Sequence, residues 1–405
     1  MAENLDEILQ RAAQTKVPRR SFLAAAGLLG GSAALAACGS GSSGASAAPG
    51  ASAGASAAAS ADAGASAAPV GDVEKQLFMY NWSDYTSPKN IDAFKAKFGV
   101  EKFQYDTFAN NEELLAKLQA GATGYDVAAP TAEYVPSMVE GGYIQKLDWS
   151  RIPNQKYIDP AFMGLAWDPN NEYQLPKDFG TTGVLYRSKV VKEPVTSWQE
   201  FYDLSKGKYS GKVVLVDSMG DVMTMPLKMI GKSLNSVEKE DLDQVRTLLL
   251  DLAPHILALD SDTYQDKLAS EEAVLCLGWT GPIVELRANP DTADIAYTVP
   301  SDGTLFWLDT WVLIADAPNP NAAYAFINYA YQPEHQAQIS AWTASVTPVT
   351  GVNEVLQKTD PTLARSNLIF PSAQYTKNCS PVTSPPGRPA DQQKVEQAWA
   401  SAITG

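Results

Sequence analysis

The chain divides into two parts by the pattern of its hydrophobic and polar positions. From about residue 77 onward, short apolar runs of the kind that form buried strands alternate with segments whose apolar residues recur every three to four positions, as on one face of a helix. The run at residues 77–80 predicts the first strand. The helix after it is predicted to be capped by Ser87, to start at Pro88 and to stop at Gly99.

This alternation continues along the rest of the chain. Further strands are predicted near residues 102–105, 125–129, 212–216 and 273–277, and further helices near residues 111–119, 134–139, 242–252 and 322–331. Such alternation favours an α/β fold with mixed, mainly parallel sheets and helices on both faces. Because 405 residues exceed what one ordinary hydrophobic core organises, we expect two lobes.

The first seventy or so residues have a different character. Arg19-Arg20 precedes an apolar stretch that is short and rich in Gly and Ala for a permanent transmembrane helix, and the stretch ends in Leu35-Ala-Ala-Cys38. This order resembles a twin-arginine export signal followed by a bacterial lipobox, in which the cysteine thiol carries the lipid. We therefore predict a signal peptide at residues 1–37 and lipidation at Cys38.

Residues 38–72 are predicted to form a tether between the lipid anchor and the folded part. They are nearly all Ala, Ser, Gly and Pro after the cysteine, so they cannot bury enough apolar surface to offset the entropy lost on ordering. The pattern Gly39-x-Gly41-x-x-Gly44 matches a dinucleotide-binding motif by chance, because no strand precedes it.

Charge and the reactive side chains exclude several functions. The formal net charge is −15 and there is no extended Lys/Arg run, so we expect no nucleic-acid partner. The only histidines are His255 and His335, and no zinc motif or nucleophile elbow accompanies them, so neither an enzyme, a metal site nor a cofactor is predicted. Cys276 and Cys379 either pair in an oxidising compartment or remain buried thiols.

Candidate ligand-binding residues follow the predicted strands, because ligands of α/β sheets bind beyond the carboxyl ends of the strands. Five such places supply aromatic rings, hydroxyls and carboxylates: Trp82-Ser-Asp-Tyr85, Thr131-Ala-Glu133, Ser218-Met-Gly-Asp221, Gly278-Trp279 and Trp307-Leu-Asp309.

Together these residue types suit an alkyl diamine. Its ammonium groups need carboxylates, its methylene chain needs flat apolar walls, and aromatic faces attract the cation directly. Each residue alone has an ordinary role, since a Trp packs in a core and an Asp such as Asp84 or Asp221 caps a helix. Their coincidence at several strand ends favours an organic cation.

From about residue 77 to its end, the chain resembles the spermidine/putrescine-binding proteins of bacterial polyamine ABC importers. The matching stretches include Tyr80-Asn-Trp-Ser-Asp-Tyr85, Gly142-Tyr-Ile-Gln-Lys-Leu-Asp148, Asp168-Pro-Asn-Asn-Glu-Tyr-Gln-Leu-Pro176 and Leu305-Phe-Trp-Leu-Asp309. The resemblance implies a two-lobe, type II periplasmic-binding-protein-like fold with a hinged cleft. It puts crossing strands near residues 180–186 and 306–314.

The resemblance also implies boundaries and contacts. Lobe 1 would comprise residues 73–182 plus about 306–345, and lobe 2 residues 183–305 plus about 346–405. Asp221 and Asp309 would hold amines, and Trp82, Tyr85 and Trp279 would wall the carbon chain. The full set of expected ligand-binding residues is Trp82, Ser83, Asp84, Tyr85, Thr131, Glu133, Ser218, Asp221, Trp279, Trp307 and Asp309.

The implied role is that of an exported monomeric receptor, which delivers a polyamine to ABC permease and ATPase subunits. It would be held at the outer face of the cytoplasmic membrane, on the periplasmic or extracellular side, by its lipid alone. Glu133 stands where the spermidine binders carry a tyrosine, and Pro282 stands where the putrescine type has a second aspartate. Ser345 aligns with a tyrosine of the family, whereas Ser218 matches putrescine-type members. The choice of polyamine therefore stays open.

Two alternatives remain from the residues themselves. The same fold and role suit a different organic amine or another solute, although anion and ferric-iron sites call for other residue sets. A cleft with Trp and paired carboxylates also suits a glycosidase.

Overall fold

The computed structural model describes residues 72–404, apart from residues 122–123, 282, 373–375 and 384–389. The described residues form one compact unit. The predicted signal peptide, Cys38 and nearly all of the predicted tether lie outside the described residues, and so does Pro282.

Ten strands form one mixed sheet within the described residues, in the order β2-β1-β3-β9-β4-β7-β5-β6, with β8 beside β4 and β10 beside β9. Pairs toward the two ends of the sheet are parallel, whereas the central pairs β3–β9, β9–β4 and β4–β7 are antiparallel. The strands are β1 (Gln76–Asn81), β2 (Lys102–Thr107), β3 (Val127–Ala128), β4 (Gln174–Arg187), β5 (Val213–Leu215), β6 (Ala258–Leu259), β7 (Leu275–Trp279), β8 (Ile295–Thr298), β9 (Thr304–Leu313) and β10 (Cys379–Ser380).

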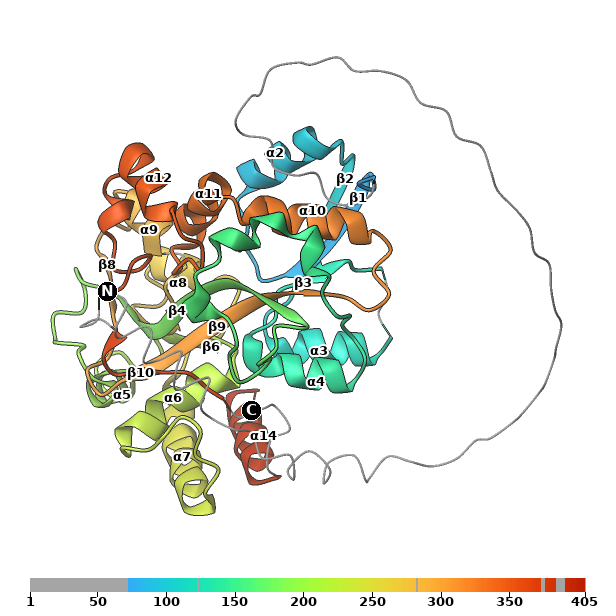
Figure 1. The fold of residues 1–405 in the computed structure, drawn as a ribbon. Helices are drawn as coiled ribbons and strands as arrows, with labels where there is room; N and C mark the ends of the chain where they lie inside the picture. Colours follow the sequence, from blue (N-terminus) through green and yellow to red (C-terminus); the bar gives the residue numbers. More distant parts are fainter. Residues whose placement is uncertain (1–71, 122–123, 282, 373–375, 384–389, 405) are drawn as a thin grey trace, which may run out of the picture. The chain divides into compact units, whose positions relative to one another are not determined.

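Helices flank the sheet, and the predicted α/β class is confirmed (Figure 1). They are α2 (Pro88–Phe98), α3 (Asn111–Gln119), α4 (Val135–Glu140), α5 (Trp198–Lys206), α6 (Met219–Met229), α7 (Lys239–Leu252), α8 (Tyr264–Ala269), α9 (Ile283–Ala288), α10 (Pro320–Ala330), α11 (Pro333–Thr343), α12 (Val352–Thr359) and α14 (Ala390–Thr404). Short 3₁₀ turns are η2 (Ala132–Tyr134), η3 (Trp149–Arg151), η4 (Pro153–Tyr157), η5 (Pro160–Phe162), η6 (Ala253–His255) and η7 (Leu363–Arg365).

The middle of strand β1, from Leu77 to Tyr80, is apolar, as expected for a strand with both faces covered. Leu77 and Met79 belong to the core cluster that contains Phe94 of α2 and Phe326 of α10. Tyr80, which points the other way, packs in the cluster that includes residues of α3 and α4. We call β1–β3 with α2–α4 and α10–α12 the first lobe.

Local signals set the ends of the helices. Gly99 ends α2 in the left-handed conformation with φ of 71°, which glycine adopts without strain. Ser87 stands at the N-cap of α2 as expected, but its side chain makes no capping hydrogen bond. Asn110 caps α3, because its side chain accepts a hydrogen bond from the Glu113 backbone N–H.

A second core lies around β5 and β7. Leu242, Val245 and Leu249 of α7 are buried in it, as their helical spacing predicted, together with Trp198 of α5 and Trp399 of α14. Helix α14 packs against α7. We call β5–β8 with α5–α9 and α14 the second lobe.

Two long strands connect these lobes. Strands β4 and β9 pair in antiparallel register from Gln174 to Thr181, and both predicted crossings fall at these strands (Figure 1). The predicted boundaries of the lobes stay a prediction as a whole. However, Val352 and Leu356, predicted to belong to lobe 2, pack in the core cluster of the first lobe, because α12 lies against α11 there.

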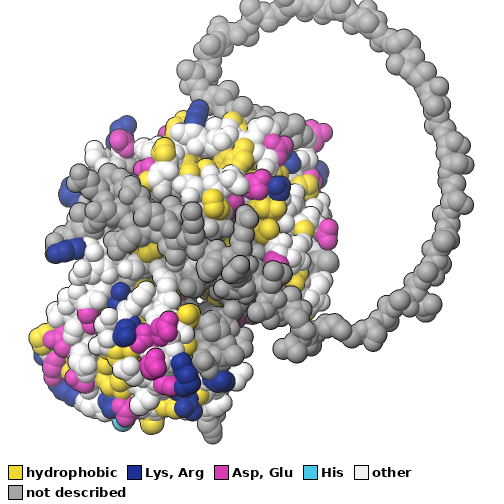
Figure 2. Space-filling model, turned by 60° about the horizontal axis from the view of Figure 1, so that its bottom comes forward, with side chains coloured by type: hydrophobic (Ala, Val, Ile, Leu, Met, Phe, Trp, Pro, Cys, Tyr) yellow, Lys and Arg dark blue, Asp and Glu magenta, His cyan; other side chains and the backbone are white. Residues whose placement is uncertain are grey.

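Several further features bear on the functional classes. On the face shown in Figure 2, basic side chains are interspersed with acidic ones rather than gathered into a patch. No helix among the described residues has the length and apolar character that a membrane span requires. The described residues also include no group of three or more His, Cys, Asp or Glu arranged to hold a metal ion. Cys276 and Cys379 are both buried, and no disulfide joins them.

Candidate functional site

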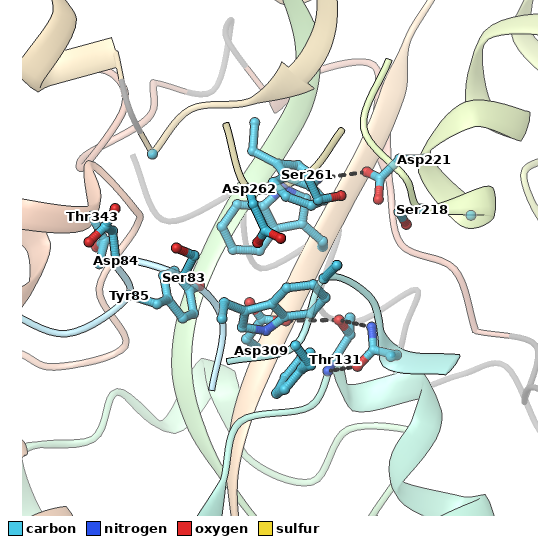
Figure 3. Close-up of a pocket in the computed structure, with 18 of the residues that line it drawn as sticks. Ser83, Asp84, Tyr85, Thr131, Ser218, Asp221, Ser261, Asp262, Asp309 and Thr343 are labelled. Atoms are coloured by element: carbon cyan, nitrogen blue, oxygen red, sulfur yellow. Dashed lines mark hydrogen bonds between the residues drawn. The ribbon is translucent and has the colours of Figure 1, made fainter. Parts of the chain in front are cut away.

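A cavity of about 390 Å³ opens where the first lobe, the second lobe and strand β9 meet. All eleven residues predicted to bind ligand line it, together with residues that the sequence did not single out (Figure 3). In the view of Figure 3, Ser218 and Asp221 lie on one side, Asp84 and Thr343 lie on the other, and Asp309 with Thr131 lies between. The strand-end rule therefore located the cavity correctly.

Two tryptophans form the aromatic wall. Trp82 follows β1 in the first lobe, and its indole Nε1 donates to the Ala129 carbonyl at 2.9 Å. Its ring packs on Phe108, with ring centroids 4.5 Å apart. Trp279 ends β7 in the second lobe and meets Trp82 edge to face at a centroid distance of 5.7 Å. The two lobes are thus in aromatic contact at the cavity.

Trp307 forms part of the wall because a glycine lies opposite it. In the β4–β9 pair Gly180 is the partner of Trp307. A side-chain carbon at Gly180 would lie 2.2 Å from the Trp307 ring, which leaves no room for any other residue in this conformation. The glycine of the predicted crossover therefore allows the indole to lie flat on β4.

Asp309 is held on β9 by a short hydrogen-bond chain. Its Oδ1 accepts from the Thr131 hydroxyl at 2.9 Å. Asn111 fixes that threonine, donating to its Oγ1 at 2.8 Å and accepting from its backbone N–H at 3.0 Å. Asp309 is only 6% exposed. Burial raises the pKa of Asp309 to about 7, although Tyr85, Lys177 and Thr131 act in the opposite direction.

Asp221 occupies the first turn of α6 and is also only 6% exposed. Its Oδ1 accepts from the Thr182 hydroxyl and from the Trp279 indole Nε1 at 3.1 Å. Burial raises the pKa of Asp221, while hydrogen bonds from Ser218, Thr182 and Trp279 act against that rise. The same contact with Trp279 orients the indole toward the cavity.

The remaining predicted residues lie toward the rim. Ser83 and Asp84 are exposed, and Asp84 has a positive φ of 51°. Glu133 is half-buried, and its Oε1 lies 4.0 Å from where a side-chain carbon on Gly220 would be, so it faces the first turn of α6. A carboxylate in that position is stabilised by the partial positive charge at the helix N-terminus.

Sequence reasoning missed several lining residues. Phe108 and Tyr264 complete the aromatic wall, Asp262 is an exposed rim carboxylate, and Trp342 and Thr343 end helix α11. The Trp342 indole donates to the Asp84 carbonyl at 2.7 Å. Neither Trp342 nor Thr343 follows a strand, so the rule that located the others does not extend to them.

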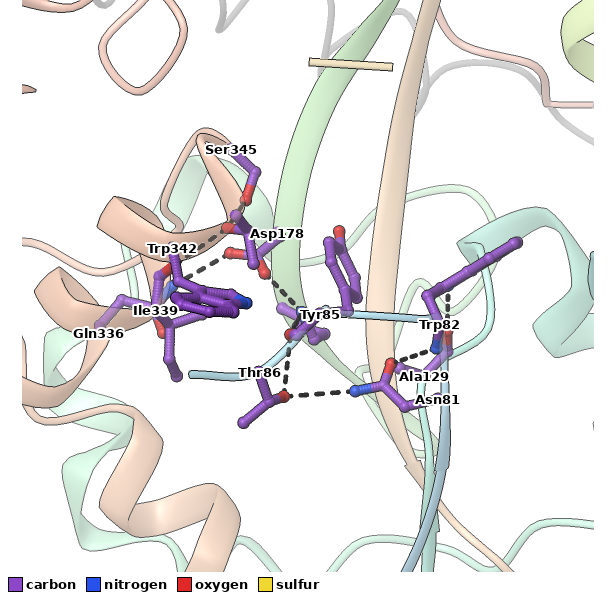
Figure 4. Close-up of polar contacts among 12 residues, drawn as sticks. Asn81, Trp82, Tyr85, Thr86, Ala129, Asp178, Gln336, Ile339, Trp342 and Ser345 are labelled. Carbon is purple, nitrogen blue, oxygen red and sulfur yellow. Dashed lines mark hydrogen bonds and ion pairs between the residues drawn. The ribbon is translucent and has the colours of Figure 1, made fainter. Parts of the chain in front are cut away.

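Lys177 and Asp178 form a buried pair that the sequence did not single out. The pair lies beside Tyr85, and Figure 4 labels Tyr85 and Asp178. The Lys177 ammonium is 2.5 Å from Oδ2 of Asp178, and both side chains are at most 1% exposed. Lys177 also donates to the Tyr85 carbonyl at 3.2 Å and lies 3.2 Å from the centroid of the Tyr85 ring. Gln336 donates to the other Asp178 oxygen at 3.1 Å.

Ser345 belongs to this buried layer and does not line the cavity. It lies beside Asp178 and in hydrogen-bond contact with the Thr343 hydroxyl (Figure 4). The residue that contacts the cavity in this segment is Thr343.

The chemistry of the cavity is that of an organic-cation site. Of the lining residues within the described part of the chain, none is Lys, Arg or His, and five are Asp or Glu. Two of these carboxylates are buried beside aromatic faces, an arrangement that favours a ligand with both positive charge and hydrocarbon.

Two α/β lobes joined by long crossing strands, with a ligand-sized cavity between them, are the arrangement found in extracytoplasmic solute-binding proteins. The model of the bacterial extracellular solute-binding protein family matches residues 89–366. The chain belongs to this family.

Individual relatives of this chain are polyamine-binding proteins of the same family. The chain is 31% identical over 309 residues to the spermidine/putrescine-binding periplasmic protein of Escherichia coli, covering 76% of this chain and 86% of the relative. It is 34% identical over 283 residues to the putrescine-binding periplasmic protein of the same organism, covering 66% and 76%. A solved spermidine/putrescine ABC transporter protein from Listeria monocytogenes superposes with a TM-score of 0.73 at 27% identity, covering 81% of this chain and 99% of that one.

Proposed function

We propose that this protein is the receptor of an ABC importer and that it captures a polyamine, such as putrescine or spermidine, in the cavity. The observation that carries the proposal is the placement of two buried carboxylates, Asp221 and Asp309, in one cavity walled by Trp82, Tyr85 and Trp279. Similarity to polyamine-binding periplasmic proteins supports the same ligand class.

Each end of the ligand would meet a carboxylate that already accepts from neutral donors. Thr131 would orient Asp309, and Thr182 with Trp279 would orient Asp221. An ammonium group brings two or three N–H donors, so it can satisfy the remaining lone pairs of a buried carboxylate. The aromatic faces would pack on the methylene chain between the two ends and exclude water.

The N-terminal part of the proposal rests on the order of residues alone. The twin-arginine pair, apolar stretch and Cys38 support export and lipid anchoring at the outer face of the cytoplasmic membrane. The receptor would act as a monomer and meet the permease and ATPase subunits there. Incorporation of a labelled fatty acid that is lost in Cys38→Ser checks the anchor, and an unlabelled wild-type chain would contradict it.

Thermal unfolding of the purified protein with a panel of amines tests the ligand class. Putrescine, cadaverine, spermidine, spermine and agmatine should include at least one compound that raises the melting temperature, since a ligand that binds only the folded state stabilises it. Lysine and arginine serve as controls that carry a carboxylate. A clear shift from another solute with none from any polyamine would sink the assignment.

A second arm addresses the glycosidase alternative, which the same Trp-and-carboxylate cavity suits. Incubation with aryl glycosides should release no chromophore. Hydrolysis of a glycoside by the wild type that is lost in Asp309→Asn would show that the protein is an enzyme and would contradict the receptor proposal.

A further inference from the structure

Among the residues that the structure describes, three carboxylates are buried in or next to the cavity, and only one of them is paired with a cation. Asp221 and Asp309 line the cavity and are buried, and within the described residues neither forms an ion pair with Lys, Arg or His. A third buried carboxylate, Asp178, lies behind the wall and is paired with Lys177. Lys177 and Asp178 sum to zero charge whether the proton sits on the amine or on the carboxyl group.

The pair sits close enough to affect a bound cation. The Lys177 ammonium lies over the Tyr85 ring and donates a hydrogen bond to the Tyr85 carbonyl. Tyr85 in turn lines the cavity beside Asp309. The Tyr85 ring therefore contacts the Lys177–Asp178 pair and also lines the space that a ligand would occupy.

The exposed carboxylates contribute less to selection by charge. Asp84 and Asp262 are at the rim and exposed to solvent, where water and salt screen their interaction with a ligand. Glu133 already faces the first turn of α6. Buried charges act through a lower effective dielectric, so they dominate any discrimination between ligands of different charge.

We infer that Lys177 is a built-in ammonium that neutralises Asp178 and leaves the cavity two uncompensated buried carboxylates, so that the site selects a dication, a diamine, over a trication such as spermidine. The inference rests on the proposed polyamine function and specifies its ligand. A third ammonium would find no buried carboxylate left to receive it, and at the Tyr85 end it would face the charge of Lys177.

Three variants change the buried charge in steps without replacing a lining residue. Lys177→Met adds one uncompensated negative charge, Asp178→Asn adds one uncompensated positive charge, and the double variant Lys177→Met/Asp178→Asn restores the original sum. The measured quantity is the ratio of dissociation constants, spermidine over putrescine, from calorimetry. Because an unpaired buried acid ionises best at higher pH and an unpaired buried amine at lower pH, each ratio is measured at pH 6.5 and 8.0.

The wild-type ratio should exceed one. Lys177→Met should lower it by about tenfold at pH 8.0, and Asp178→Asn should raise it by about tenfold at pH 6.5, as expected for one buried charge acting across roughly 10 Å. The double variant should return the ratio to the wild-type value. N1-acetylspermidine has nearly the length of spermidine but only two charges. Its ratio of dissociation constants to putrescine should stay the same in all variants, which separates the effect of charge from that of length.

The outcomes separate the two proposals. If no polyamine binds the wild type, the proposed function fails first. If polyamines bind but spermidine is preferred, or if all three variants weaken both ligands by the same factor, the pair is merely structural and the inference is overturned. If circular dichroism shows that Lys177→Met does not fold, the inference is tested by comparing two variants. The ratio of dissociation constants should be about tenfold higher in Asp178→Asn than in the double variant.

Discussion

The two buried carboxylates of the cavity are the same residue type in two different settings. Asp309 lies on a strand that crosses between the lobes, accepts a hydrogen bond from Thr131 of the first lobe, and has Lys177 nearby. Asp221 lies on the first turn of α6 in the second lobe and accepts from Thr182 and Trp279. Asp309 thus belongs to a crossing strand and is bonded to the first lobe, whereas Asp221 belongs to a helix of the second lobe.

The comparison suggests a division of labour. A carboxylate on a crossing strand keeps its position when the lobes move, so Asp309 is suited to hold the ligand in both open and closed states. Asp221 belongs to a helix of the second lobe, so we expect its contact with the ligand to depend more strongly on closure. A ligand bound to both ends would link them, which is the differential affinity that a closing receptor requires.

The largest expected effect is the loss of the Asp309 charge. Asp309→Asn leaves one buried ammonium unpaired, so we expect polyamine affinity to fall by about 2–5 kcal/mol. Calorimetric titration measures it, and Asp262→Asn, which removes the same charge from the exposed rim, is the matched control. Equal losses in the two variants would mean that burial of Asp309 does not matter.

Asp221→Asn should cost less, about 1–3 kcal/mol, because Thr182 and Trp279 already share the charge of this carboxylate and the amide oxygen can still accept from both. Titration measures the affinity, and the change in tryptophan fluorescence on ligand addition should also shrink, since Trp279 loses its charged acceptor. If Asp221→Asn weakened binding more than Asp309→Asn, Asp221 and not Asp309 would contribute more to affinity.

The two ends should also differ in their response to pH. The pKa of Asp309 is raised to about 7, so ligand affinity should fall as pH is lowered through 7, by at most about tenfold per pH unit. The ligand-free protein binds this proton more tightly than the unfolded chain, so its stability should decline as pH rises from about 4 to about 7. Asp309→Asn should remove this component of both profiles, and a profile unchanged in that variant would exclude Asp309 as its source.

The smallest effect is expected at the rim. Trp342→Phe keeps an aromatic ring but loses the hydrogen bond to the Asp84 carbonyl, so affinity should fall by only about 0.5–1.5 kcal/mol. Titration with putrescine measures it, and the Asp309 variant sets the scale. A loss as large as that of Asp309→Asn would show that the rim, and not the buried ends, holds the ligand.

Much of the fold and of the cavity followed from local pattern. Apolar runs buried on both faces, such as β1, and stripes such as that of α7 have unambiguous periods. Because strands of such sheets expose their carboxyl ends on one side, Trp82, Thr131 and Trp279 were brought to one cavity although they lie far apart in the chain.

The rest depends on tertiary contacts that no period encodes. Trp342 reaches the cavity from the end of a helix, and α12 joins the first lobe through its packing on α11. Lys177 and Asp178 lie in strand β4, which also contains Gln174 and Arg187, so no local pattern distinguished them. Two opposite charges are tolerated in a core when they are buried as a pair. The sequence does not reveal that this pair lies next to a residue of the cavity wall.

The contact between Trp82 and Trp279 has a kinetic consequence. In the described state the two rings already touch across the lobes, so a carbon chain cannot pass between them until they separate. Ligand entry should therefore wait for a unimolecular opening step, and the observed binding rate should level off at high ligand concentration instead of rising in proportion to it. The same contact would delay escape, which gives the importer time to meet a loaded receptor.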